Sequence, residues 1–131
     1  MQAKKWNYPQ VAWSEPTGAL KRMAATGRPG LVLIKTDWCP RCTELSTQFA
    51  DADLMTLAAE FELILLDQDE NKEMAARWAK DGAYIPRIFF LKADGSVLTE
   101  LVGTNARFKY FFEGHDKTFL LSTMRRAISL K

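Results

Sequence analysis

The chain has 131 residues, of which 47% are hydrophobic and 26% are charged, a balance typical of one globular domain rather than of a disordered or fibrous chain. Eighteen Lys and Arg residues against sixteen Asp and Glu residues give a formal charge of +2, so nucleic acid is not an expected partner. The longest apolar runs, such as "LVLIK" and "IFFL", are far shorter than the roughly 18 residues that cross a bilayer, so no membrane span is expected.

The first expected elements are a helix and a strand. Residues 13–27 carry apolar side chains at helical spacing, with Ser14 as the expected N-cap, Pro16 in the first turn and Gly27 at the C-terminal end. Residues 30–36, "GLVLIKT", are aliphatic and β-branched, which predicts a strand buried on both faces. A helix therefore precedes the first strand of the expected sheet.

A second strand and more helical segments follow. Residues 39–61 show a helical spacing that the polar step at 51–53 interrupts, which predicts two consecutive helices or one interrupted helix. Residues 62–69, "ELILLDQD", predict a second buried strand. Residues 70–82 predict another helix, which should end at Gly82 because glycine often closes a helix.

The last third of the chain predicts antiparallel strands and a final helix. Residues 87–103 hold two strand-like runs around "KADG", in which Asp94–Gly95 is a strong hairpin signal. Residues 118–130 predict an amphipathic helix. A βαβ half followed by a hairpin and a helix implies an α/β fold with a central mixed β-sheet flanked by helices on both faces.

Both cysteines of the chain, Cys39 and Cys42, lie in "TDWCPRCTEL", where the first strand gives way to a helix. Chemistry in open α/β sheets gathers at such strand ends. Two thiols at this spacing fit a redox pair, half of a metal site or two buried core cysteines. A zinc site needs four ligands, and with His115 as the sole histidine it would need carboxylates as well. A redox pair without a metal or a bound cofactor is the favoured interpretation.

The two thiols of such a pair have different tasks. A helix N-terminus favours a thiolate, so Cys39 is expected to be the exposed nucleophile. Cys42, one turn further on, is expected to be the shielded thiol that resolves a mixed disulfide. Pro40 is tolerated in a first helical turn, because its missing N–H is not needed there. Arg41 adds a permanent positive charge that favours the Cys39 thiolate and makes the pair more oxidising.

"WCPRC" after an apolar strand, with "YIPRIFF" downstream, resembles the active-site pattern of the thioredoxin fold. "GAYIPRIFFLKADGSV", "FKYFFEG" and the final "LLSTMRRAI" are similar to the small endoplasmic-reticulum thioredoxin-like proteins and the anterior-gradient proteins. The resemblance covers the chain from about Trp13 onwards. It implies a single thioredoxin-like domain over 1–131, with an N-terminal extension and helix at about 1–28 and a redox core at about 29–131.

The resemblance also implies roles for individual residues. Cys39 matches the family nucleophile, Cys42 the resolving cysteine and Trp38 the ring beside the site. Pro86 matches a cis-proline that faces the cysteines, so the Ile85–Pro86 bond is expected to be cis. The backbone beside that proline is expected to offer strand-like hydrogen bonds to an extended substrate.

The sequence also departs from the general thioredoxin pattern. Leu33 stands six positions before the first cysteine, where reductase-type thioredoxins carry a buried Asp, and the middle pair is Pro-Arg instead of Gly-Pro. Lys35, Asp37 and Glu44 are the candidates for handling the Cys42 proton, although each is expected to be a solvated charge.

Two further features leave alternatives open. Arg87, directly after the proline of "YIPR", either faces the site or points to solvent. The aromatic run "FKYFF" at 108–112 is expected to pack into the core or as a loop against the fold, with a partner-binding surface as the second interpretation.

These patterns predict a monomeric thiol–disulfide oxidoreductase that acts on protein or peptide thiols and disulfides through a mixed disulfide at Cys39, and that a redox partner resets. The alternative is a chaperone-like or adaptor module that binds clients at the Pro86 groove with little redox turnover. The resemblance favours an oxidising extracytoplasmic compartment, the periplasm or endoplasmic-reticulum lumen, if a signal peptide precedes Met1 in the native chain. The start "MQAKKWNYPQ" lacks the apolar region of an intact signal peptide, and a chain that begins after a removed signal would look the same. The alternative location is the cytoplasm.

Overall fold

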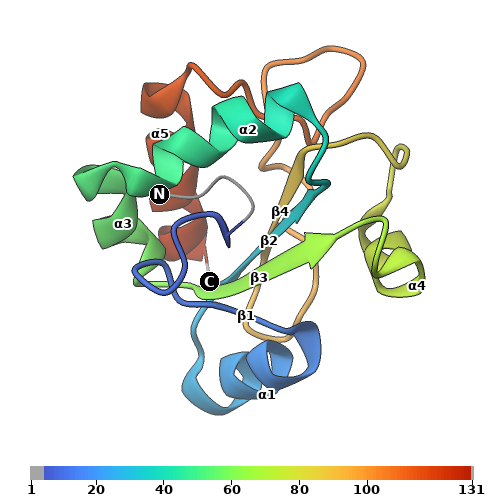
Figure 1. The fold of residues 1–131 in the computed structure, drawn as a ribbon. Coiled ribbons are helices and arrows are strands. Elements are labelled where there is room, and N and C mark those ends of the chain that lie inside the picture. Colours follow the sequence, from blue (N-terminus) through green and yellow to red (C-terminus); the bar gives the residue numbers. More distant parts are fainter. Residues whose placement is uncertain (1–4, 131) are drawn as a thin grey trace.

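The computed structural model describes residues 5–130, so the first four residues and the last residue of the predicted domain lie outside the described part (Figure 1). Four strands form one mixed sheet in the order β1-β3-β2-β4. They are β1 (Trp13–Ser14), β2 (Gly30–Lys35), β3 (Glu62–Asp67) and β4 (Arg87–Leu91). β3 runs parallel to both β1 and β2, whereas β4 runs antiparallel to β2.

Helical segments connect the strands and cover both faces of the sheet. They are α1 (Pro16–Thr26), α2 (Pro40–Ser46), the 3-10 turn η2 (Thr47–Ala50), α3 (Ala52–Ala58), α4 (Lys72–Ala75), the 3-10 turn η3 (Ala76–Trp78) and α5 (Lys117–Leu130). Figure 1 shows α2, α3 and α5 on one side of the sheet and α1 and α4 on the other. The predicted mixed sheet with helices on both faces is confirmed. No helix among residues 5–130 is long and apolar enough to cross a membrane.

The central strand β2 explains why helices are needed on both sides. Successive side chains of a strand point to opposite faces. Leu31 and Leu33 accordingly join the buried cluster under α2, α3 and α5, whereas Val32 and Ile34 join the cluster under α1 and α4. All four side chains are fully buried, which explains the continuous apolar run in the sequence.

The first helix begins later than predicted. Ser14 is not its N-cap, because Trp13 and Ser14 pair with β3 as a short strand. The Glu15 carboxylate caps α1 instead, and accepts hydrogen bonds from the backbone N–H groups of residues 17 and 18. Gly27 closes the helix with a φ of 77°, as predicted.

The helical region after the cysteines is interrupted, as predicted, and the next helix is shorter than predicted. Asp51 breaks the first region and caps α3 with a hydrogen bond from the Leu54 N–H at 3.1 Å. The helix expected over 70–82 ends at Trp78. The Arg87 guanidinium binds the carbonyls of Ala75 and Trp78, which a continuing helix would need for its own hydrogen bonds.

The predicted hairpin around "KADG" forms only in part. The turn is present, with the Gly95 N–H bonded to the Lys92 carbonyl at 2.8 Å, but the second arm makes a single bridge, between Leu91 and Val97. The Leu101 N–H then bonds back to the Leu98 carbonyl, a turn that ends the pairing. The main antiparallel partner of β4 is therefore β2.

Candidate active site

Cys39 and Cys42 lie at the junction of β2 and α2. Cys39 is the N-cap residue of α2, and its Sγ accepts a hydrogen bond from the Cys42 N–H at 3.1 Å. Pro40 occupies the first turn, where no intrahelical partner is needed for its nitrogen. Both cysteines are free thiols in this structure. A hydrogen bond to sulfur at a helix start favours the thiolate of that residue.

The expectation that Cys39 is exposed is wrong. Only 4% of Cys39 and 2% of Cys42 are accessible, so the two residues differ little in exposure. Cys39 belongs to the buried cluster on the α2 side of the sheet, and its Sγ lies within hydrogen-bond distance of the Cys42 N–H. The two thiols differ in their position on α2, since Cys39 is the N-cap residue and Cys42 lies within the first turn.

The surroundings of Cys42 keep its proton in place. Burial raises the pKa of the Cys42 thiol far above its usual range, and the hydrogen bond with the Cys39 side chain acts in the same direction. A hydrogen bond from the Thr36 backbone and the positive charge of Lys35 both lower the pKa of Cys42, but by less. Cys42 is therefore a neutral thiol near neutral pH.

Lys35 is buried, contrary to the expectation that it is solvated. Its Nζ lies 2.7 Å from Asp37 Oδ1 and 3.4 Å from Asp67 Oδ2. Glu44, by contrast, is exposed on α2, as expected. Asp67 was not among the candidate residues, although its place at the end of "ELILLD" mirrors the place of Lys35 at the end of "GLVLIK". Two strand ends thus bring charges together near Cys42.

Trp38 lies beside Cys39 and is 69% exposed. Its Nε1 donates a hydrogen bond to Asp69 Oδ2 at 2.8 Å, which holds the ring towards the loop after β3. Among the large apolar residues of the described chain, such exposure is unusual, since most of them are buried. The ring therefore belongs to the surface around the thiols.

The Ile85–Pro86 bond is cis, as the resemblance implied. Pro86 is buried, and Ile85 is partly buried. Within residues 5–130, no hydrogen bond uses the backbone N–H or C=O of Ile85. These two groups stay available to an extended peptide.

Arg87 neither faces the site nor points to solvent, so both interpretations from the sequence are wrong. The residue is 1% exposed. Its guanidinium donates to the carbonyl oxygens of Trp78, Tyr84 and Ala75 and to the side-chain oxygen of Gln68, at 2.7, 2.6, 3.2 and 2.5 Å. Five N–H donors in a planar fork allow one side chain to satisfy several buried acceptors. Arg87 thus holds the segment before Pro86 against β4.

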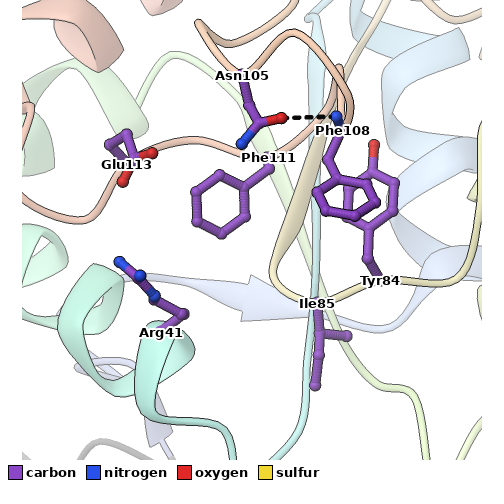
Figure 2. A pocket seen from close by; sticks show the side chains of 7 residues that line it. All are labelled: Arg41, Tyr84, Ile85, Asn105, Phe108, Phe111 and Glu113. Carbon is purple, nitrogen blue, oxygen red and sulfur yellow. Dashed lines mark hydrogen bonds between the residues drawn. The ribbon is translucent and has the colours of Figure 1, made fainter.

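The site borders a hollow of about 300 Å³, which we name the aromatic pocket (Figure 2). Its walls are Tyr84, Ile85, Phe108 and Phe111, together with Arg41, Asn105 and Glu113. The aromatic run at 108–112 is divided between two environments. Tyr110 and Phe112 are buried, as expected for core packing, whereas the side chains of Phe108 and Phe111 line the pocket. The division follows a turn in this loop, in which the Phe111 N–H donates to the Phe108 carbonyl at 3.1 Å.

No group of three His, Cys, Asp or Glu side chains suited to a metal ion occurs among residues 5–130.

Comparisons with known proteins agree with this geometry. A family model described as "Thioredoxin-like" matches residues 12–93. Anterior gradient protein 2 homolog of Mus musculus is 29% identical over 124 residues, which is 92% of this chain and 69% of that protein. Thiol:disulfide interchange protein DsbD of Ralstonia nicotianae is 29% identical over 115 residues, which is 88% of this chain and 18% of that protein. The solved DsbH Oxidoreductase has a TM-score of 0.68 at 18% identity, and the match covers 92% of this chain and 86% of that one. The predicted fold is confirmed.

Proposed function

Since the chain belongs to the thioredoxin-like family, and its relatives support a thiol–disulfide oxidoreductase activity, we propose that it acts on protein or peptide thiols and disulfides through a mixed disulfide at Cys39. The observation that carries this proposal is the hydrogen bond from the Cys42 N–H to Cys39 Sγ, 3.1 Å long, at the start of α2. It stabilises negative charge on Cys39 Sγ, so we assign the attack on the client to this sulfur.

In the reducing direction, the Cys39 thiolate attacks one sulfur of a client disulfide. A bond forms between Cys39 and that sulfur, the client disulfide breaks, and its second sulfur leaves as a thiolate that takes up a proton. Cys42 then loses its proton and attacks Cys39 Sγ, which releases the client thiol and leaves a disulfide between the two cysteines. Two electrons pass to the client, and the reverse sequence oxidises a client dithiol.

The Cys42 proton is the obstacle in the second step, because burial holds the pKa of this thiol high. The Lys35 charge opposes this effect and favours the Cys42 thiolate at the moment of attack. A second redox partner resets the pair after each turnover. The direction depends on the potential of the pair relative to its compartment.

Ile85 supplies the contact with the client backbone. Its N–H and C=O are not used by any hydrogen bond within the described part of the chain. An extended client segment that pairs with these groups gains affinity without regard to its side chains. We place the protein, as a single-domain monomer, in an oxidising extracytoplasmic compartment, a location that the similarity to the anterior-gradient protein and to DsbD suggests.

The test compares the parent with Cys39→Ser, Cys42→Ser and the double variant on a peptide disulfide. We expect turnover by the parent alone, and a covalent peptide adduct, seen as a mass increase, on Cys42→Ser but not on Cys39→Ser. If all four proteins behave alike, the redox proposal fails. Non-covalent client binding that is equal in all four proteins would instead support a chaperone-like or adaptor module.

A further inference from the structure

The aromatic pocket is continuous with the reacting site. Arg41 stands between the two cysteines, and Ile85 is the residue before Pro86, yet both line the same hollow. In Figure 2 the Phe111 ring lies between the charged pair Arg41 and Glu113 on one side and the Phe108 and Tyr84 rings on the other. Neither cysteine lines the pocket, but a client that is bonded to Cys39 and paired with the Ile85 backbone would pass along it.

The walls of the pocket are held in place by the protein itself. The Tyr84 hydroxyl donates to Asp81 Oδ1 at 2.6 Å and accepts from the Tyr110 N–H at 2.9 Å. The Phe108 ring lies against Tyr84, with 4.7 Å between the ring centroids. Asn105 Oδ1 accepts from the Phe108 N–H at 2.8 Å, a bond drawn in Figure 2. A preformed pocket binds without the cost of ordering its walls.

The charges of the pocket select against a charged occupant. Arg41 and Glu113 carry opposite charges, and no ion pair joins them in the described structure. A carboxylate that approaches Arg41 is repelled by Glu113, and an ammonium group that approaches Glu113 is repelled by Arg41. A neutral side chain is repelled by neither residue, and burial of its apolar surface against the aromatic walls is favourable.

We propose that the aromatic pocket binds one large, uncharged apolar side chain, above all an aromatic one, next to the cysteine of the client polypeptide. The proposal rests on the proposed function and specifies its substrate class. The N–H and C=O of Ile85, which no hydrogen bond uses within the described residues, align the client backbone. The pocket then binds the side chain of a client residue on one side of the client cysteine. Since successive side chains of an extended chain point in opposite directions, only some positions near the cysteine reach it.

The test uses short alanine-based peptides whose single cysteine carries a 2-thiopyridyl group as a disulfide. The Cys42→Ser variant stops the reaction after one step. The Cys39 thiolate bonds to the peptide sulfur, the pyridyl disulfide breaks, and pyridine-2-thione leaves and is followed by its absorbance. Phenylalanine is placed at each of the two positions on either side of the cysteine. We expect a rate about tenfold above that of the all-alanine peptide, on one side of the cysteine only.

Matched variants then locate the effect. In the Cys42→Ser background, Phe111→Ala should reduce the phenylalanine preference to less than about twofold, and Phe111→Leu should retain part of it. Phe119→Ala removes a partly buried ring outside the pocket, so the preference should persist. The peptide scan alone tests the proposal if a pocket variant does not fold.

Three outcomes would contradict the pocket proposal. They are equal rates for the phenylalanine and alanine peptides, a faster reaction with Glu or Lys than with phenylalanine at the same position, and equal acceleration by phenylalanine at all four positions. A small disulfide without a peptide, 2,2′-dithiodipyridine, separates the two proposals. If it reacts with Cys39 while the peptides show no preference, the pocket proposal fails and the proposed function stands. If neither it nor any peptide reacts at Cys39, the proposed function itself fails.

Discussion

The ammonium group of Lys35 lies 3.4 Å from the carboxylate of Asp67, and the two residues are register partners at the ends of β2 and β3. Their side chains are only 7% and 11% exposed. Two parallel strands that end in a lysine and an aspartate thus place an ion pair beneath the cysteine-bearing turn. Leu33, which replaces the buried acid of reductase-type thioredoxins, carries no charge, whereas the Lys35 charge acts on Cys42.

Lys35→Met should slow the release of the client. Because the Lys35 charge lowers the pKa of Cys42, its loss raises that pKa further, so less thiolate forms at any pH below it. Each unit of increase slows the second step about tenfold at neutral pH. The measurement is the rate at which a preformed mixed disulfide at Cys39 resolves, as a function of pH. The curve should shift to higher pH.

The matched control for this shift is Lys92→Met, which removes an exposed lysine at the far turn of β4. An unchanged pH curve in Lys35→Met would leave Lys35 with a structural role alone. That role is measurable as well, since the variant leaves two carboxylates without their partner and should lower the free energy of unfolding by about 2 kcal/mol.

Arg41→Ala should make the redox potential of the cysteine pair more negative. The Arg41 guanidinium lies in the CxxC motif and favours the thiolate, and hence the reduced form, but it is exposed and screened by salt. We expect the potential to become more negative by up to about 30 mV, as measured by equilibration with glutathione. This shift should be smaller at high salt. Arg107→Ala removes another exposed arginine and should leave the potential unchanged. An unaltered potential in Arg41→Ala would remove Arg41 from the tuning of the pair.

Arg87→Met should destabilise the protein by about 3 kcal/mol, because it leaves buried carbonyl oxygens at residues 75, 78 and 84 without a donor. Arg87→Lys should recover only part of this loss, since an ammonium group lacks the fork geometry. Urea unfolding measures both variants. Arg77→Met removes an exposed arginine that lies over the Trp78 ring and should cost less than about 1 kcal/mol. Equal losses in the methionine variants at 77 and 87 would contradict this account.

Gly103→Ala should disturb the loop that carries Phe111. A Cβ at Gly103 would lie 2.1 Å from the Phe111 carbonyl oxygen, which is a backbone atom that cannot rotate away. We expect a loss of about 1–3 kcal/mol in unfolding free energy and a weaker phenylalanine preference in the peptide assay. Gly18→Ala serves as the control for the peptide assay: its Cβ would press on the Glu15 carboxylate that caps α1, far from Phe111 in sequence, so any loss of stability should leave the phenylalanine preference unchanged. A stable Gly103→Ala with full preference would show that the loop adapts.

The strands and helices could be predicted because each leaves a local pattern. β2 and β3 are runs of apolar residues, α5 has a helical stripe, and Gly27 is a residue that adopts positive φ without strain. The two thiols at the end of a strand could be predicted in the same way, whereas the cis bond before Pro86 was expected from the resemblance to thioredoxins. The end of the helix after β3 is different, because local preference predicts a longer helix. There the hydrogen bonds from Arg87 to the carbonyls of Ala75 and Trp78 set the point at which the helix ends.

By itself, the sequence determined the mixed α/β fold and the position of the two thiols at a strand-to-helix junction, because short-range periodicity and backbone preference encode these features. Only the tertiary structure decided that Cys39 is buried, that Lys35 pairs with Asp67, that Arg87 is an internal brace and that Phe108 and Phe111 line a pocket. These features depend on which groups the folded chain brings together, and the charge or hydrophobicity of a residue does not reveal which groups will desolvate it or pair with it.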